Sequence, residues 1–441
     1  MTASTTPHPN LSSSTDMPPP KRVVVTGLGM LNPLGTNSDE VWSSVREGKS
    51  GIRTIELFDA SPLPVRIAGE VRNFKGKDYV EKHERKTLKV MARSIQLAVA
   101  TAKLALKDSQ IDKSKLDPTR FGVEFGSGLI ATELEELAGA AKVSGNLIPN
   151  QVDLEKWGDE GIPNIAPLWM LKYLPNMLAC HVSILEDAQG PNNTITEGDV
   201  AGLLAIGESY RILQRDQADF FLVGGADSKI NPLSMVRQCL FGKLSSRNDD
   251  PEKASRPFDK NRDGLVIGEG AGVIALENLD HATSRGARIY AELIGFGSSY
   301  DLKCNGDGIS RAILAALREA NLSGEDLDHI NAHGLSVVPV DLWEARGIHK
   351  ALGDLAPKVK VFAGKSYFGN TGAASGPSEL ILSLLGQQND CLPATLNFEE
   401  SDPECPLNVT REATKPTSPY FLKVGFTDMG QVAALVFRKW S

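Results

Sequence analysis

The segment from Thr194 to Gly207, TITEGDVAGLLAIG, has the arrangement of residues most suited to chemistry. A short extended stretch is followed by Gly198 and then by an apolar pattern typical of a helix, which predicts a sharp strand-to-helix turn. Such a turn, a nucleophile elbow, exposes the side chain at its tip to substrate. The residue at the tip is Asp199, so the site depends on what a carboxylate can do there.

A carboxylate at this position has three conceivable roles. As a nucleophile on an acyl group, Asp199 would form a mixed anhydride, which is labile. As a general base it would act beside a histidine. As a helix N-cap it would need no substrate, because aspartate is a favoured cap and its charge stabilises a helix N-terminus by about 0.3 to 1 kcal/mol. We expect the capping role.

Three other motifs resemble parts of ligand-binding loops but are incomplete. GLGMLN begins like a dinucleotide-binding loop, yet Asn32 stands where the third glycine is needed. GKS at residues 364–366 lacks the leading glycine of a phosphate-binding loop, because Val359 occupies that place. DKNRDG at residues 259–264 opens like a calcium loop, but Gly270 replaces the bidentate glutamate. We therefore expect neither a cofactor nor a metal.

Composition and charge exclude several kinds of partner. The chain has 441 residues and a formal net charge of -8, without a lysine and arginine run of the sort that binds nucleic acid. No apolar run approaches the roughly 18 residues that a membrane span needs. The five cysteines are scattered and odd in number, which is typical of a reducing compartment. We expect a cytoplasmic protein with a disordered tail over residues 1–21, which are rich in serine, threonine and proline.

Strands and helices are predicted to alternate along the chain. A β-branched run from Val23 predicts a strand that enters a loop at Gly27 and Gly29. This alternation indicates an α/β fold with a covered central sheet, and its order recurs after a junction near residues 280–290, which suggests an internal duplication. The other predicted elements are a helix over residues 86–107, strands over 121–128, 219–228 and 272–279, strands in HINAHG, VFAGKS and AALVFRKW, and a helix over 378–385.

Several motifs occur in the order found in one enzyme family. They are VTGLGMLNPLG near the start, the glycine elbow, SRPFDKNRDGLVIGEGAG (255–272), NAHG (331–334), GKS and LPATLNFEESDPEC near the end. Over residues 22–441 the chain resembles the β-ketoacyl-acyl carrier protein synthase family, of the 3-oxoacyl-ACP synthase II type. The resemblance implies a thiolase-like, five-layered αβαβα fold in two halves, which we place at residues 22–285 and 286–441, and usually a dimer.

The resemblance also assigns positions in the catalytic site. Members of the family use a cysteine nucleophile, two histidines, and a supporting lysine and glutamate. The cysteine stands at the elbow because a helix N-terminus lowers its pKa and backbone N–H groups there can hold an oxyanion. In this chain Asp199 stands at the cysteine position and Asn370 at the second histidine position. His333, Lys365 and Glu379 match the first histidine, the lysine and the glutamate.

Substrate-contact positions also depart from the family pattern. Two threonines that hold the pantetheine arm in the family correspond to Leu335 and Val337. The gating phenylalanine of a glycine-rich loop corresponds to Asp428, in GFTDMGQV. Loss of the hydroxyl groups and gain of a charge both predict a site that no longer handles the usual substrate.

These departures lead to two hypotheses about function. In the first, the chain is a non-condensing homologue in fatty acid or polyketide biosynthesis that pairs with an active synthase, in the manner of a chain-length factor. In the second, it is an enzyme of altered chemistry that hydrolyses or decarboxylates acyl or malonyl thioesters with His333 and Asp199. Either hypothesis implies acyl carrier protein or an acyl thioester as a partner, and a homodimer or a heterodimer with an active ketosynthase. Whether the chain is an enzyme is left open.

Overall fold

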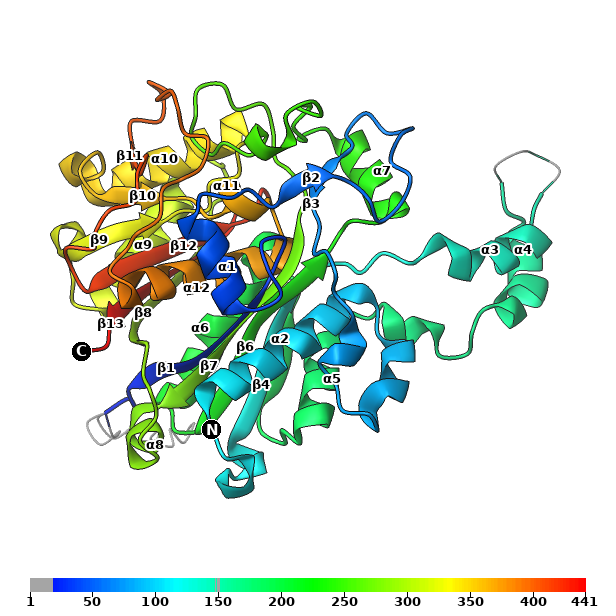
Figure 1. Ribbon diagram of the computed structural model, residues 1–441, viewed down its shortest axis with the longest axis horizontal. Helices are drawn as coiled ribbons and strands as arrows, with labels where there is room; N and C mark the ends of the chain where they lie inside the picture. Colours follow the sequence, from blue (N-terminus) through cyan, green and yellow to red (C-terminus); the bar gives the residue numbers. More distant parts are fainter. Residues whose placement is uncertain (1–18, 147, 149–150) are drawn as a thin grey trace, which may run out of the picture.

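Residues 19–146, 148 and 151–441 are described by the computed structural model of this chain (Figure 1). The tail predicted over residues 1–21 lies outside this range except for its last three residues. Lys21, at its end, donates its backbone N–H to the carbonyl oxygen of Gln214 at 3.0 Å. Within the described residues, no helix is both long enough and apolar enough to cross a membrane.

One large mixed sheet forms the centre of the molecule (Figure 1). A separate two-stranded ribbon is made by β2 (Ile52–Thr54) and β3 (Ile67–Gly69). The large sheet contains β1 (Val23–Leu31), β4 (Phe121–Ser127), β5 (Asn192–Ile195), β6 (Phe220–Ser228), β7 (Glu269–Asn278), β8 (Ala291–Tyr300), β9 (Leu327–Asn331), β10 (Lys360–Phe362), β11 (Asn408–Val409), β12 (Tyr420–Phe426) and β13 (Gln431–Lys439).

The strand order repeats itself in the two halves of this sheet. The first half runs β5-β4-β6-β7-β1 and the second runs β10-β9-β12-β13-β8. In each half the first two pairings are parallel and the next two are antiparallel. Strands β1 and β8 then pair with each other in antiparallel fashion and join the halves. The repeated order confirms the predicted duplicated α/β fold.

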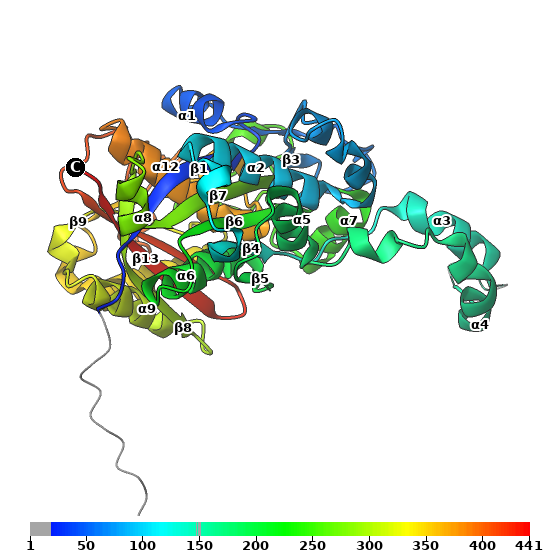
Figure 2. The same ribbon diagram turned by 90° about the horizontal axis from the view of Figure 1, so that it is seen from below.

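The helices form layers on both sides of the two half-sheets (Figures 1 and 2). Helices α2 and α5 cover the outer face of the first half, α9 and α10 cover that of the second, and α6 and α12 lie between the halves. The helices are α1 (Ser38–Arg46), α2 (Arg93–Ser109), α3 (Leu134–Val143), α4 (Leu154–Lys156), α5 (Met177–Glu186), α6 (Ala201–Gln214), α7 (Pro232–Phe241), α8 (Leu279–Ser284), α9 (Asp307–Glu319), α10 (Val338–Leu352), α11 (Lys365–Phe368) and α12 (Ser375–Gln388).

The loop predicted at Gly27 and Gly29 is not present. Both glycines lie inside strand β1, so this prediction was wrong. Helix α2 crosses β1 so closely that a Cβ atom on Gly27 would lie 2.4 Å from the carbonyl oxygen of Ala105. A Cβ atom on Gly29 would lie 2.3 Å from the carbonyl oxygen of Thr101. Glycine is therefore required by the packing of a helix against the strand, and no turn is involved.

Two similar turns lead into the two central helices. A 3-10 turn at Gly198–Val200 precedes α6, and another at Gly372–Ala374 precedes α12. Each begins with a glycine at positive φ, 54° for Gly198 and 58° for Gly372, a conformation that glycine adopts at little cost. The two turns also lie against each other at the centre of the molecule. The predicted elbow is thus present, and the second half carries its counterpart.

Candidate functional site

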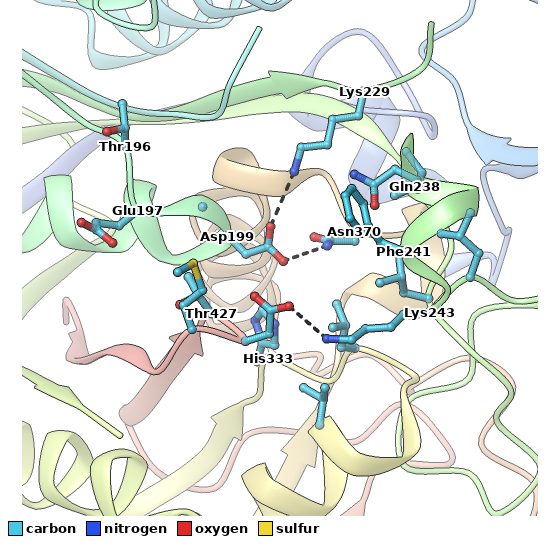
Figure 3. A pocket seen from close by; sticks show the side chains of 18 residues that line it. Thr196, Glu197, Asp199, Lys229, Gln238, Phe241, Lys243, His333, Asn370 and Thr427 are labelled. Atoms are coloured by element: carbon cyan, nitrogen blue, oxygen red, sulfur yellow. Dashed lines mark hydrogen bonds and ion pairs between the residues drawn. The ribbon is translucent and has the colours of Figure 1, made fainter. Parts of the chain in front are cut away.

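A cavity of about 530 Å³ opens at the first elbow (Figure 3). It brings together five residues that the sequence placed in the site, namely Asp199, His333, Leu335, Asn370 and Asp428. Lys365 contacts His333 from behind the wall and is itself paired with Glu379, whereas Val337 is buried outside the lining. The remaining lining residues are Thr196, Glu197, Gly198, Lys229, Gln238, Phe241, Lys243, Leu244, Leu265, Ile267, Val340, Thr427 and Met429.

Asp199 points toward Asn370 across the cavity (Figure 3). The Nδ2 atom of Asn370 donates a hydrogen bond of 2.8 Å to Oδ2 of Asp199, and the Nζ atom of Lys229 lies 4.0 Å from Oδ1. Neither the 3-10 turn nor α6 has a side-chain cap. The expected capping role of Asp199 is therefore wrong. The amide donor and the nearby ammonium ion hold the carboxylate away from the helix N-terminus.

His333 presents one fixed tautomer to the cavity. Lys365 Nζ can only donate, and it lies 3.2 Å from Nδ1 of His333, so this nitrogen is the acceptor and Nε2 carries the proton. The other two donors of Lys365 reach the carbonyl oxygen of His333 and Oε1 of Glu379, both at 2.7 Å. Burial, together with the neighbouring lysines, holds the pKa of His333 well below its ordinary value. The imidazole is therefore a neutral hydrogen-bond donor at physiological pH.

A second buried lysine, Lys423, supports the same glutamate and was not identified from the sequence. Its ammonium group donates to Oε2 of Glu379 and, at 3.0 Å each, to Oδ1 of Asn331 and the carbonyl oxygen of Ala332. Burial lowers the pKa of Lys423 to about 8. The lysine in the middle of the apolar strand FLKVGF was the available signal, because a charged residue rarely lies in a buried strand without a partner.

The loop after His333 is held by two buried carboxylates. Glu344 accepts the backbone N–H groups of His333 at 2.7 Å and Gly334 at 2.8 Å. Asp341 accepts those of Leu335 at 2.9 Å and Ser336 at 3.2 Å. Burial raises the pKa of Glu344 to about 7 and that of Asp341 to about 6. These bonds fix the backbone on which His333 is mounted.

The segment that resembled a calcium loop is part of this supporting structure. Arg262 lies 3.2 Å from the carboxylate of Asp341 and is buried with it. Asp259 uses Oδ2 to accept the backbone N–H groups of Glu399 and Glu400, both at 2.8 Å. The oxygen atoms of this segment therefore bind protein donors and fasten one loop to another.

The mouth of the cavity contains an ion pair. Lys243 follows α7, and its Nζ atom lies 2.9 Å from Oδ2 of Asp428, in the turn between β12 and β13 (Figure 3). Phe241 and Met429 flank this pair with 75% and 78% of their surface exposed. Asp428 is thus paired with Lys243 at the edge of the opening, and 60% of its side chain is exposed.

A charged cluster beside Asp199 also went unnoticed in the sequence. Lys229 follows strand β6, and its Nζ atom lies 3.5 Å from Oδ2 of Asp227 and 4.0 Å from Oδ1 of Asp199. Asp227 and Lys229 are separated only by Ser228 in the pattern GGADSK, but no sequence feature indicated that Asp199 lies next to them.

Solved structures with this architecture match the chain along its length. The ishigamide ketosynthase/chain length factor aligns with 96% of this chain and 100% of its own, with a TM-score of 0.83 and 28% identity. A structure described as a type II PKS acyl-carrier protein in complex with its ketosynthase, AntDE:AntF, aligns over the same shares with a TM-score of 0.80 and 30% identity. The chain therefore has the fold of the thiolase-like ketosynthase structures.

Sequence comparison narrows this class to a family. The N-terminal domain of β-ketoacyl synthase matches residues 20–282, and the C-terminal domain matches residues 290–399. The 3-oxoacyl-[acyl-carrier-protein] synthase 2 of Vibrio harveyi is 36% identical over 429 residues, which cover 95% of this chain and 99% of that protein. The chain belongs to the β-ketoacyl synthase family.

Proposed function

We propose that this chain is a non-condensing member of the family that pairs with an active synthase in fatty acid or polyketide synthesis, as a chain-length factor does. One observation carries the proposal: the side chains at the nucleophile and second histidine positions, Asp199 and Asn370, are hydrogen-bonded to each other at 2.8 Å. In the family these two positions act on the substrate. Here the amide group of Asn370 is hydrogen-bonded to the carboxylate of Asp199, so the two side chains bind each other.

The chemistry of a carboxylate supports the same proposal. A growing acyl chain on Asp199 would be a mixed anhydride and would hydrolyse. A malonyl carboxylate about 4 Å from Asp199 would be repelled by about 4 kcal/mol at an effective dielectric constant near 20. Lys229, at 4.0 Å from Asp199, offsets part of this repulsion. The site still has no thiol at the nucleophile position and only one of the two histidines that condensation uses.

An arm that projects from the body offers a surface for a partner subunit (Figure 2). It includes α3 and α4 and carries apolar side chains with large exposed fractions, among them Leu154 at 84%, Met170 at 60%, Leu168 at 58% and Ile162 at 56%. Clustered exposed apolar side chains of this kind mark interaction sites. With the resemblance to a ketosynthase/chain length factor, the arm supports pairing with a cysteine-containing synthase, which we expect to take place in the cytoplasm. The resemblance to a ketosynthase in complex with its acyl-carrier protein supports delivery of the substrate on acyl carrier protein.

Co-expression with a cysteine-containing synthase tests the proposal. We expect a tagged chain to recover the synthase in a one-to-one complex, measured by size-exclusion chromatography with light scattering. The double variant Leu154→Asp and Met170→Asp should abolish this complex. Leu240→Asp, which changes an equally exposed leucine on α7, is the matched control and should leave the complex intact. A chain that stays homodimeric in the presence of such synthases contradicts the proposal.

A second candidate function is decarboxylation or hydrolysis of malonyl or acyl thioesters. It is favoured by the intact support of His333, whose neutral Nε2–H faces the cavity as a donor for a carbonyl or enolate oxygen. Release of carbon dioxide or free acid that disappears in the variant Asp199→Ala would establish this function. Equal inactivity of the wild type and the variant would exclude it.

A further inference from the structure

Asp227 and Lys229 form a charged cluster with Asp199, and neither of the functions proposed above requires these two residues. The carboxyl groups of Asp199 and Asp227 share one ammonium ion, that of Lys229, and burial raises the pKa of Asp227. Asp227 is the buried member, with 2% of its side chain exposed, while the side chains of Asp199 and Lys229 are 18% and 24% exposed. The two wall residues therefore face the cavity, and Asp227 lies behind them.

The buried carboxylate of Asp227 binds the ammonium ion of Lys229 more closely than Asp199 does. Both carboxylate oxygens of Asp227 are buried and lack a well-aligned hydrogen-bond donor, so an unshared charge there is costly. Lys229 lies closer to Asp227, at 3.5 Å, than to Asp199, at 4.0 Å. Attraction to Asp227 also raises the pKa of Lys229, which keeps the ammonium group protonated. Oδ1 of Asp199 is left without a hydrogen bond from Lys229 and faces the cavity.

The rest of the wall specifies the other parts of a ligand. His333 supplies the Nε2–H donor, which suits a carbonyl oxygen. Leu335, Ile267 and Val340 supply apolar surface, which suits a chain of methylene groups. Glu197 adds a further exposed carboxylate beside the elbow. A ligand with a carbonyl group, an alkyl spacer and a cationic end would satisfy all three features.

We propose that the cavity selects amine-bearing acyl groups, with the ammonium ion of the ligand paired to Asp199 and its carbonyl oxygen bonded to His333. This inference rests on the proposed function in one respect, that acyl groups enter the cavity. It goes beyond that function by naming their chemical class. An acyl group that ends in a methyl group would give Oδ1 of Asp199 no hydrogen bond, and one that ends in a carboxylate would be repelled by Asp199.

Binding of three matched probes to the full chain tests the selection. The probes are pantetheine amides, which resist hydrolysis, of 6-aminohexanoic, hexanoic and adipic acids, and their affinities are measured by titration calorimetry at pH 7.5. A charge-assisted hydrogen bond predicts that the amino probe binds about ten- to a hundredfold more tightly than the hexanoyl probe, and that the adipoyl probe binds most weakly. Equal or tighter binding of the hexanoyl probe overturns the proposal.

Two substitutions with opposite expected effects identify the residue responsible. Asp199→Asn should remove most of the preference for the amino probe, whereas Lys229→Met should increase it by removing the competing ammonium ion. Asp390→Asn, an exposed aspartate paired with Lys439 at 3.0 Å, is the matched control and should keep the wild-type preference. A preference unchanged in Asp199→Asn, or lost in Lys229→Met, also overturns the proposal.

The probe experiment and the co-expression experiment test the two proposals independently. A chain that forms a complex with a synthase but prefers the hexanoyl probe refutes the selection and leaves the pairing intact. A chain that prefers the amino probe but never pairs refutes the pairing and supports the selection as a property of the cavity.

Discussion

Replacing Lys423 by methionine is expected to destabilise the site without opening it to solvent. Methionine fills a similar volume but donates no hydrogen bond to Glu379, Asn331 or Ala332, which all accept from the lysine. Glu379 keeps one partner, Lys365, at 2.7 Å. Removing one member of a buried ion pair costs about 3 to 5 kcal/mol, and the remaining lysine places this case near the lower value of about 3 kcal/mol.

The corresponding change in melting temperature follows from the size of the chain. At about 2.1 cal/mol/K per residue, 441 residues give an unfolding entropy of about 0.9 kcal/mol/K, so about 3 kcal/mol lowers Tm by about 3 °C. Circular dichroism melts measure this shift. Lys439→Met, which breaks the exposed pair with Asp390, is the control and should shift Tm by less than about 1 °C. A Lys423→Met variant as stable as the wild type would show that the buried charges are not mutually required, and would refute the reasoning.

Three further predictions concern other parts of the chain. Burial raises the pKa of Glu124 to about 9 from 4.5, so between these pH values the folded state holds a proton that the unfolded state has released. The free energy of unfolding should therefore fall as the pH rises through this range. In Glu124→Gln, urea unfolding should show a smaller fall and a greater stability than the wild type at pH 8.5. Gly29→Ala should cost about 1 to 3 kcal/mol in the same assay because its Cβ atom meets backbone, while Gly158→Ala, with open space around it, should cost little. Asp199→Cys should not restore condensation in a malonyl-transfer assay, since Asn370 still replaces a histidine; robust activity would contradict the proposed non-condensing role.

The sequence predicted the framework of the site better than its electrostatics. Ordered motifs placed Asp199, His333 and Asn370 in one site, and the structure brings all three to one cavity. The capping role of Asp199 was wrong because its hydrogen-bond partner, Asn370, lies 171 residues away in sequence. Local propensity favours the nearest backbone groups and carries no information on so distant a donor.

The buried lysine and the glycines of β1 show the same limit. Lys423 was visible as a charge in an apolar strand, but its three acceptors come from β9, the residue after it and α12. Gly27 and Gly29 read as a loop because a crossing helix is not encoded near them. Periodicity identifies which elements form, whereas the partners of a buried charge or of a glycine are fixed only when distant elements meet.

The paired turns at Gly198 and Gly372 have a consequence for how this molecule can change. Ala373 occupies in the second turn the place that Asp199 occupies in the first, and its carbonyl oxygen would lie 2.5 Å from a Cβ atom on Gly202 of α6. The second turn is therefore sealed by packing, while the first opens into the cavity. The turn at Gly372–Ala374 packs against the turn at Gly198–Val200 and supports it. The residue at position 199 can therefore be exchanged with little effect on the free energy of unfolding, so that the chemistry of the site can change while the fold is kept.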